Sequence, residues 1–273
     1  MDEGNLEHIR RWFVGYCQTF YSADPEDQRN ILLKEEHTHR VCANIIRIGA
    51  EEGLDDERLQ LAEVIALLHD VGRFEQYRQY RTFRDGISVD HAALGAEIIR
   101  EIDLLAGFYP LERDVIHHAV ESHNVFVVPK RFQGDSLYFL QLVRDADKLD
   151  IWRVFMEYYD QTGEERSAVV GLDFPDLPEC SPEILDKITN GELARLSVAK
   201  TLNDFKLIQL SWVYDLTFPE SFRMVAEREH VRAIAATLPD LPEVRRAVEA
   251  VFDFVAGKTS QHFGIPRDFP ETP

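Results

Sequence analysis

Apolar side chains recur every three or four residues along most of this chain, and this spacing restricts its fold more than any other feature. Breaks rich in glycine, proline and acidic residues, such as "EEGLDDE" and "RDGISVD", separate the apolar segments. Few segments alternate with the short period that is typical of a half-buried strand. Helices are predicted over residues 5–22, 28–53, 57–69, 90–106, 110–124, 136–161, 181–189, 191–214, 218–237 and 241–257. The sequence therefore predicts an all-α protein.

The length of the chain allows one large domain or two small ones. It has 273 residues, and 45% of them are hydrophobic, so a substantial core can form. We expect residues 1–29 to contribute an N-terminal helix that packs on the core, and residues 30–155 to form the core itself. Residues 156–273 are expected to form a helical extension that is one continuous globular unit with the core.

The charge of the chain limits its partners. The formal net charge is -19, and the acidic residues are spread along the sequence. Because binding to a phosphate backbone depends on clustered lysine and arginine, a nucleic-acid polymer is not an expected partner. A small anionic substrate is compatible with this charge if cations gather locally. The sequence leaves open whether the chain forms a homo-oligomer.

Three features favour a reduced, cytoplasmic setting away from membranes. No apolar run approaches the roughly 20 residues that span a bilayer. The N-terminus, "MDEGNLEHIRRWF", is acidic and lacks the pattern of a secretory signal. Cys17, Cys42 and Cys180 are odd in number and widely separated, so we interpret them as reduced thiols. We therefore expect a cytoplasmic protein with no membrane partner.

The stretch "VIALLHDVGRF", residues 64–74, ends an apolar run in a histidine and an aspartate, two groups that are costly to bury. Other predicted helices repeat this pattern, because at about 100° per residue they direct single polar groups toward the core face. Asp147, for example, lies in line with Leu140 and Val143. Five separate segments direct such groups inward, and the groups are His37, His69 with Asp70, His91, His123 and Asp147.

Such a set of side chains suits divalent metal ions. A buried carboxylate must be paired, hydrogen-bonded or bound to a metal. Four imidazoles and two carboxylates would hold one or two ions, and a mixed set of this size fits octahedral geometry better than four-coordinate zinc. We therefore expect one or two divalent transition-metal ions as cofactors, with iron or manganese favoured over nickel, cobalt or zinc.

Alternatives for single positions stay open at this point. A histidine on an apolar face is more often a hydrogen-bonded core residue than a ligand. His117 or His118 could serve in place of His123. We expect Asp145 and Asp150 to be solvated or to form surface ion pairs.

Five motifs in a fixed order resemble one known family. They are "HTHRV", "ALLHDVGR", "DHAALGAEII", "AVESHN" and "RDADKLD", and they cover about residues 30–155. This ordered set is similar to the HD-domain metal-dependent phosphohydrolase superfamily, which implies an HD-domain helical bundle followed by a C-terminal helical extension. The resemblance selects His37 over His39 as the first ligand and makes His69 and Asp70 the namesake pair. The metal ligands that it implies are His37, His69, Asp70, His91, His123 and Asp147.

Two positions in this set indicate the dinuclear type of site. His91 and His123 match the extra histidines of members with two ions, in which the namesake aspartate bridges the ions. The chain also resembles the HD-GYP cyclic dinucleotide phosphodiesterases in "HDVGR", but "NVFVVPKRF" follows His123 and contains no Gly-Tyr-Pro. Asn124 occupies the place of their second adjacent histidine. Cleavage of cyclic-di-GMP is therefore not expected.

The resemblance implies a metal-dependent phosphohydrolase that cleaves a small phosphomonoester or phosphodiester, such as a nucleotide, with a metal-activated water. Arg73 and Lys148 follow ligand positions and could bind the phosphate group, or could instead pair with neighbouring carboxylates. Together with Asp70 they are the catalytic candidates. Two other functions are compatible with the pattern: a diiron oxygenase of the HD type, and a ligand-binding sensor without catalysis.

Overall fold

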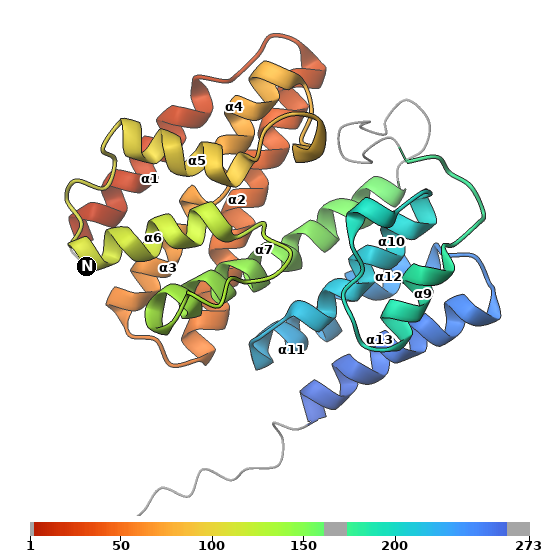
Figure 1. Ribbon diagram of the computed structural model, residues 1–273. Helices are drawn as coiled ribbons and strands as arrows, with labels where there is room; N and C mark the ends of the chain where they lie inside the picture. Colours follow the sequence, from red (N-terminus) through yellow and green to blue (C-terminus); the bar gives the residue numbers. More distant parts are fainter. Residues whose placement is uncertain (1–2, 161–173, 261–273) are drawn as a thin grey trace, which may run out of the picture. The chain divides into compact units, whose positions relative to one another are not determined.

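The computed structural model describes residues 3–160 and 174–260, and this part of the chain forms α-helices and short 3-10 helices without a strand (Figure 1). The prediction of an all-α fold is confirmed. The chain divides into two compact units. The first runs to Pro175 and includes Leu216–Phe218, and the second contains Asp176–Asp215 and the chain from Pro219 onward. That residues 156–273 form one globular unit with residues 30–155 stays a prediction.

The first unit is built around two long helices, α2 and α7, that pack against each other. Helix α3 packs on α2, α6 packs on α7, and α5 lies between α4 and α6. Helix α1 covers α3. The helices of this unit are α1 (Glu3–Gln18), α2 (Pro25–Glu51), α3 (Asp56–Leu68), α4 (Val71–Tyr80), α5 (His91–Glu101), α6 (Pro110–Ser122) and α7 (Gly134–Asp160), with the 3-10 helix η1 (Asp85–Ile87) between α4 and α5.

Aspartate caps set the start of three of these helices. The side chains of Asp24, Asp55 and Asp90 accept backbone N–H groups of the first turns of α2, α3 and α5. Those N–H groups have no partner within the helix, so each cap satisfies donors that the helix itself leaves unpaired. The cap at Asp90 makes His91 the first residue of α5. The apolar faces then bury residues such as Ile45 and Phe139 in the core.

Helix α4 is absent from the sequence-based prediction, because its segment "VGRFEQYRQY" is short, polar and interrupted by Gly72. Gly72 permits a close approach of α4 to α5, since a Cβ atom at this position would lie 2.1 Å from the carbonyl oxygen of His91 and 2.7 Å from the amide nitrogen of Gly95. A glycine two residues after a histidine–aspartate pair could be interpreted from the sequence as a place where the chain turns away, but here it has a different role. The residue lies inside a helix, and its missing side chain serves packing.

We expect Gly72→Ala to destabilise the protein by about 3 kcal/mol, because the backbone of α5 cannot move away from the added methyl group without disturbing the core. Urea unfolding followed by circular dichroism measures the change. Gly15→Ala in α1 is the matched control, since no atom lies within 4 Å of its added Cβ. That control should stabilise the protein by up to about 1 kcal/mol, from helix propensity alone. Equal stability of the two variants would contradict the close contact between α4 and α5.

The second unit contains shorter helices. Helix α13 (Pro242–Ser260) packs on α9 (Pro182–Thr189) and α11 (Pro219–Arg228), while α10 (Leu202–Ser211) packs on α9 and α12 (His230–Ala236). Two 3-10 helices, η3 (Leu196–Val198) and η4 (Trp212–Asp215), flank α10.

Two helices that the sequence predicts as continuous are divided in this unit. The helix predicted over residues 191–214 is a series of η3, α10 and η4. The helix predicted over residues 218–237 is interrupted at Glu229, where φ is 57°, and forms α11 and α12. Among the described residues, no helix is both long and apolar enough for a membrane span.

Candidate metal centre

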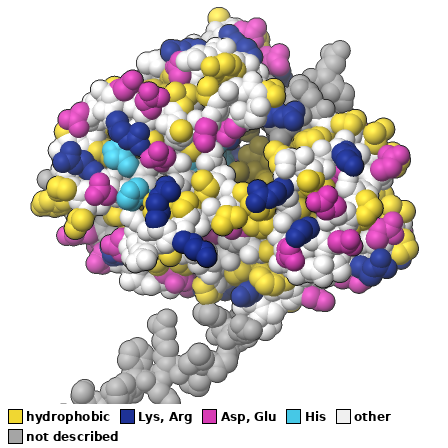
Figure 2. All heavy atoms as spheres, in the orientation of Figure 1, with side chains coloured by type: hydrophobic (Ala, Val, Ile, Leu, Met, Phe, Trp, Pro, Cys, Tyr) yellow, Lys and Arg dark blue, Asp and Glu magenta, His cyan; other side chains and the backbone are white. Residues whose placement is uncertain are grey.

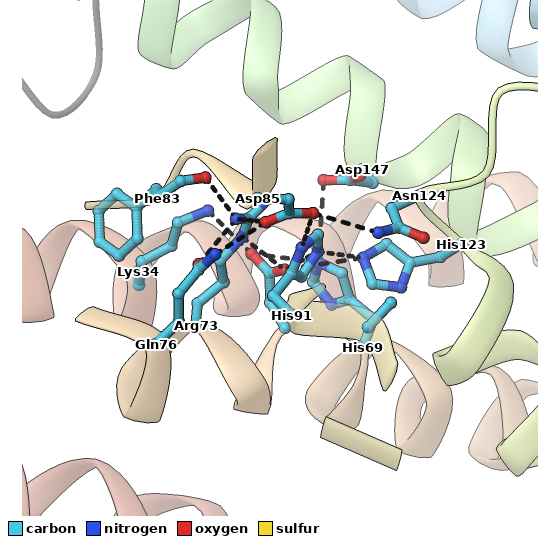
Figure 3. Close-up of polar contacts among 12 residues, drawn as sticks. Lys34, His69, Arg73, Gln76, Phe83, Asp85, His91, His123, Asn124 and Asp147 are labelled. Carbon is cyan, nitrogen blue, oxygen red and sulfur yellow. Dashed lines mark hydrogen bonds and ion pairs between the residues drawn. The ribbon is translucent and has the colours of Figure 1, made fainter. Parts of the chain in front are cut away.

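Six side chains named as candidate ligands converge inside the first unit, and Figure 3 shows several of them pointing toward one another. They come from five places in the helical bundle, and three of these places are helix ends. The residues are His37 in α2, His69 at the end of α3, Asp70 at the start of α4, His91 at the start of α5, His123 at the end of α6 and Asp147 in α7.

Asp70 lies at the centre of this arrangement, and its two oxygens face different histidines. Oδ2 lies 3.6 Å from Nε2 of His37 and 3.8 Å from Nε2 of His69. Oδ1 lies 3.3 Å from Nε2 of His91 and 3.7 Å from Nε2 of His123. Asp147 joins the first pair, since its Oδ1 is 3.1 Å from His37 Nε2 and 3.8 Å from His69 Nε2.

The distances divide these side chains into two adjacent groups that share the carboxylate of Asp70. The groups adjoin closely, because His123 also clusters with His69 and Asp147. We call His37, His69, Asp70 and Asp147 the first ligand group, and Asp70, His91 and His123 the second ligand group. Nε2 of His91 lies only 3.0 Å from Nε2 of His123, so one small ion can contact both rings.

The helix ends themselves orient two of the histidines. Nδ1 of His69 donates to the carbonyl oxygen of Ala66 at 2.7 Å, and Nδ1 of His123 donates to that of Val120 at 2.8 Å. Each acceptor is a carbonyl in the last turn of its helix, where backbone acceptors lack partners within the helix. A proton held on Nδ1 leaves the lone pair of Nε2 directed into the cluster.

Carboxylates orient the other two histidines. Nδ1 of His37 donates to Oδ2 of Asp150 at 2.8 Å, and Nδ1 of His91 donates to Oδ2 of Asp85 at 2.7 Å. The expectation that Asp150 is solvated is wrong, because its side chain is only 2% exposed and also pairs with Arg153. Sequence reasoning missed both supporting roles, although Asp150 lies one helical turn after Asp147 and Asp85 shortly precedes His91.

Asp145 is also buried, contrary to the expectation of a solvated side chain. It accepts the backbone N–H groups of Thr217 and Phe218, with the Oδ2 atom 3.0 Å from each nitrogen. At about 100° per residue, Asp145 points to nearly the opposite side of α7 from Asp147, and residues 216–218 of the same unit cover that side. Asp145 is therefore buried and hydrogen-bonded to the backbone, whereas a position on the surface was expected for it.

The donor set fits a divalent cation. Within the described part of the chain, the buried Nε2 atoms of His37 and His69 have no hydrogen-bond partner, which is a costly state unless a ligand binds them. Burial raises the pKa of Asp70, but Lys34 and His69 outweigh this effect and hold the pKa well below its usual range. The pKa of Asp147 is likewise lowered against the effect of burial, by His37 and His69. Both carboxylates are therefore ionised.

The pKa of His37 reports the surplus of negative charge in the cluster. Burial lowers this pKa, yet the carboxylates of Asp147 and Asp150 raise it to about 9. The negative charge of these carboxylates, which favours a proton on the ring, would be neutralised in the same way by a bound metal ion. His123 differs, because burial lowers its pKa to about 4 and keeps the imidazole in the neutral form that binds metals.

Comparison with known proteins identifies the domain that carries these groups. Residues 35–152 match the family model of the HD domain. These residues form an HD domain. All six candidate ligands lie inside the matched range. Proteins of the HD-domain superfamily are generally metal-dependent hydrolases.

A solved structure of a predicted HD superfamily hydrolase from an uncultured Thermotogales bacterium is 25% identical to this chain. The match covers 59% of this chain and 82% of that one, with a TM-score of 0.37. Among curated proteins, no sequence matches.

Lys34 is the cation nearest the shared carboxylate of the HD domain. Figure 3 shows Lys34 beside the side chains of the candidate ligands. Its Nζ lies 2.9 Å from Oδ2 of Asp70, and its side chain is 15% exposed. Lys34 is not among the candidates predicted from the sequence, although it precedes His37 by three residues and therefore shares the inward face of α2. The three-residue spacing between Lys34 and His37 is the sequence feature from which its position could have been predicted.

The two cations that were selected as catalytic candidates have other partners. NH1 of Arg73 donates to the side chains of Gln76 and Asp85 and to the carbonyl oxygen of Phe83, while its Nε lies 3.6 Å from Oδ1 of Asp70. Nζ of Lys148 donates to the carbonyl oxygen of Arg144 at 3.4 Å. Arg73 thus lies near Asp70, but hydrogen bonds to other groups hold its guanidinium in place. Lys148 contacts the backbone of its own helix.

The alternative histidines lie outside both ligand groups of the HD domain. Nδ1 of His118 is 3.0 Å from the hydroxyl of Ser136, and its ring packs on Phe132. His117 belongs to none of the candidate metal-binding clusters within the described residues. The geometry therefore brings His123, and neither of these neighbours, to Asp70.

Proposed function

We propose that this protein is a metal-dependent phosphohydrolase that cleaves a small phosphomonoester or phosphodiester, with nucleotides as the first candidates. One observation carries the proposal: the carboxylate of Asp70 is shared by two ligand groups and lies 2.9 Å from the ammonium group of Lys34. Metal ions held by these groups, together with the ammonium group of Lys34, would neutralise a bound phosphate group, and phosphoryl transfer requires little beyond positioning and charge neutralisation.

The proposed cofactors are one or two divalent transition-metal ions, with iron or manganese favoured over nickel, cobalt or zinc. The first ligand group offers two imidazoles and two carboxylates, and the second offers two imidazoles and the shared carboxylate. Such nitrogen and oxygen donors suit these metals, whereas thiolates are absent from both groups. When bound, such ions lower the pKa of a water molecule to near neutrality and stabilise charge on phosphoryl oxygens.

Lys34 is the side chain that we assign to the substrate anion. Acidic and basic side chains are mixed on the face drawn in Figure 2, and the net charge is -19, so the attraction for an anion must arise locally. An ammonium group has three donors, and Asp70 accepts from only one of them. Arg73 and Lys148 stay candidates for substrate contact, but hydrogen bonds to Asp85 and to the carbonyl oxygen of Arg144, respectively, hold them to the protein.

We expect Lys34→Gln to lower kcat/KM by about 10- to 100-fold, since a hydrogen bond to a charged group contributes about 1.5–3 kcal/mol. Initial rates of phosphate release over a range of substrate concentrations measure this effect. Arg40→Gln is a matched control on the same helix, because Arg40 is 49% exposed and pairs with Glu36 on the surface. Loss of activity in the control, or normal kinetics in Lys34→Gln, would remove Lys34 from the substrate site.

The proposed function is tested with protein purified without chelator and without oxygen. Metal content per chain is measured first, and phosphate release is then assayed with a panel of nucleotides and a chromogenic ester in the presence of manganese, nickel or cobalt. Metal-dependent release of phosphate supports the proposal. Consumption of oxygen without phosphate release would indicate a diiron oxygenase, and nucleotide binding without turnover would indicate a sensor; either result contradicts hydrolysis.

A further inference from the structure

We infer that Asp85 and Asp150 are positioning residues, each of which holds and polarises one histidine of one ligand group. This inference rests on the metal centre in the proposed function and deepens it. Asp150 acts on the first ligand group through His37, and Asp85 acts on the second ligand group through His91. The two ligand groups therefore have separate supports, although they share Asp70.

The pattern of Nδ1 contacts is the same in both ligand groups. In the first, a backbone carbonyl holds His69 and a carboxylate holds His37. In the second, a backbone carbonyl holds His123 and a carboxylate holds His91. A buried hydrogen bond to a neutral carbonyl would have been sufficient to orient the rings, as it is for the other two histidines. The carboxylates therefore supply charge in addition to orientation.

The added charge changes what the histidine offers to an ion. A carboxylate that accepts the Nδ1–H bond fixes the tautomer and increases the electron density at Nε2, so the ring binds a metal ion more strongly. Loss of such a partner typically weakens metal affinity by about 10- to 100-fold. Both carboxylates contact the far side of a ring whose Nε2 faces the shared Asp70.

The two supports differ in how firmly they are held. Asp150 is 2% exposed, lies in α7 and accepts two bonds from Arg153, at 2.8 and 3.0 Å. Asp85 is 31% exposed and lies in η1, within the connection between α4 and α5. Its oxygens accept bonds from Arg73, Gln76 and Asn124 in addition to His91, as Figure 3 shows.

This difference predicts unequal affinities of the two ligand groups. The first group has four ligands and a support that is part of a buried helix. The second has three, and its support depends on a partly exposed connection that Arg73 and Gln76 hold to α4. The first ion should therefore enter the first ligand group, and the ion of the second ligand group should be the one that exchanges more readily.

The test titrates metal-free protein with Co²⁺ alone, and follows both the heat of binding and the visible absorption of bound cobalt. Wild-type protein should bind two equivalents in two steps. Asp85→Asn should weaken the second step by about 10- to 100-fold and leave the first unchanged, and Asp150→Asn should weaken the first step by a similar factor. His91→Ala and His37→Ala assign each step to its ligand group, because each should weaken the same step as its supporting aspartate.

Glu121→Gln is the matched control. Glu121 lies in α6 two residues before His123, but its side chain is 46% exposed, pairs with Arg100 and belongs to no candidate metal-binding cluster among the described residues. This variant removes one negative charge near the second ligand group without touching an Nδ1 atom, so both binding steps should keep the wild-type affinity. Thermal unfolding of each metal-free variant reports on the fold, and if Asp150→Asn does not fold, the more exposed Asp85→Asn decides the question alone.

Wild-type affinity at both steps in Asp85→Asn would overturn the inference, and so would equal weakening of both steps by a folded variant. These results do not depend on turnover. Wild-type protein that binds two ions in steps but releases no phosphate contradicts the proposed function alone. Wild-type protein that binds no cobalt contradicts both.

Discussion

Asp70→Asn is expected to reduce phosphate release by about 10³-fold or more, because metal ions supply several kcal/mol of transition-state stabilisation and both ligand groups use this carboxylate. Asparagine keeps the size of the side chain but has one neutral oxygen in place of two charged ones. The metal content should fall together with the activity, from about two ions per chain to one or none if the dinuclear centre forms as proposed. Phosphate assays and elemental analysis of the same preparation measure both effects.

Glu75→Gln provides the control for this variant. Glu75 also lies in α4 and also carries a carboxylate, but it pairs with Arg78 and belongs to neither ligand group. Activity and metal content should both stay at the wild-type level in this control. An Asp70→Asn protein that is folded and retains full activity would exclude the proposed centre as the catalytic site.

Removal of metal should lower the thermal stability of the protein. An ion that binds only the folded state stabilises it by about 3 kcal/mol when its concentration is a hundred times its Kd. For a unit of this size, each kcal/mol shifts Tm by roughly 2–4 °C, so a chelator should lower Tm by about 6–12 °C. The physical origin is the surplus negative charge around His37, which the ion neutralises in the folded state only.

Differential scanning calorimetry before and after dialysis against a chelator measures this shift. Return of Mn²⁺ should restore Tm, and metal-free Asp70→Asn should show no comparable response to chelator or to Mn²⁺. A wild-type Tm that is the same with and without metal would contradict tight binding at the two ligand groups, whatever the activity.

Much of the centre could be predicted from the sequence because helical periodicity is a local property. A histidine or aspartate that interrupts an apolar stripe must face the interior, and this reasoning applies to His37 in α2 and to Asp147 in α7 without knowledge of the fold. The order of the motifs predicted an HD domain, which the family match supports. The structure brings the six side chains together, and their role as ligands stays a proposal.

The same local reasoning failed where burial comes from a distant part of the chain. Asp145 faces away from the ligands on its helix, but residues 216–218 cover that face and supply its hydrogen bonds. Asp150 is buried because His37, far away in the sequence, approaches it. Helix α4 forms despite weak propensity because it packs on α5, and Gly72 permits this contact.

The sequence by itself determined that the protein is helical and which polar side chains its helices direct inward, since both follow from residue spacing within single elements. Only the tertiary structure decided how those side chains divide into two ligand groups, which cation lies beside Asp70, and which carboxylates support His37 and His91. These are contacts between elements. Their partners are chosen by the packing of whole helices, and the pattern within one helix carries no information about which helix will lie next to it.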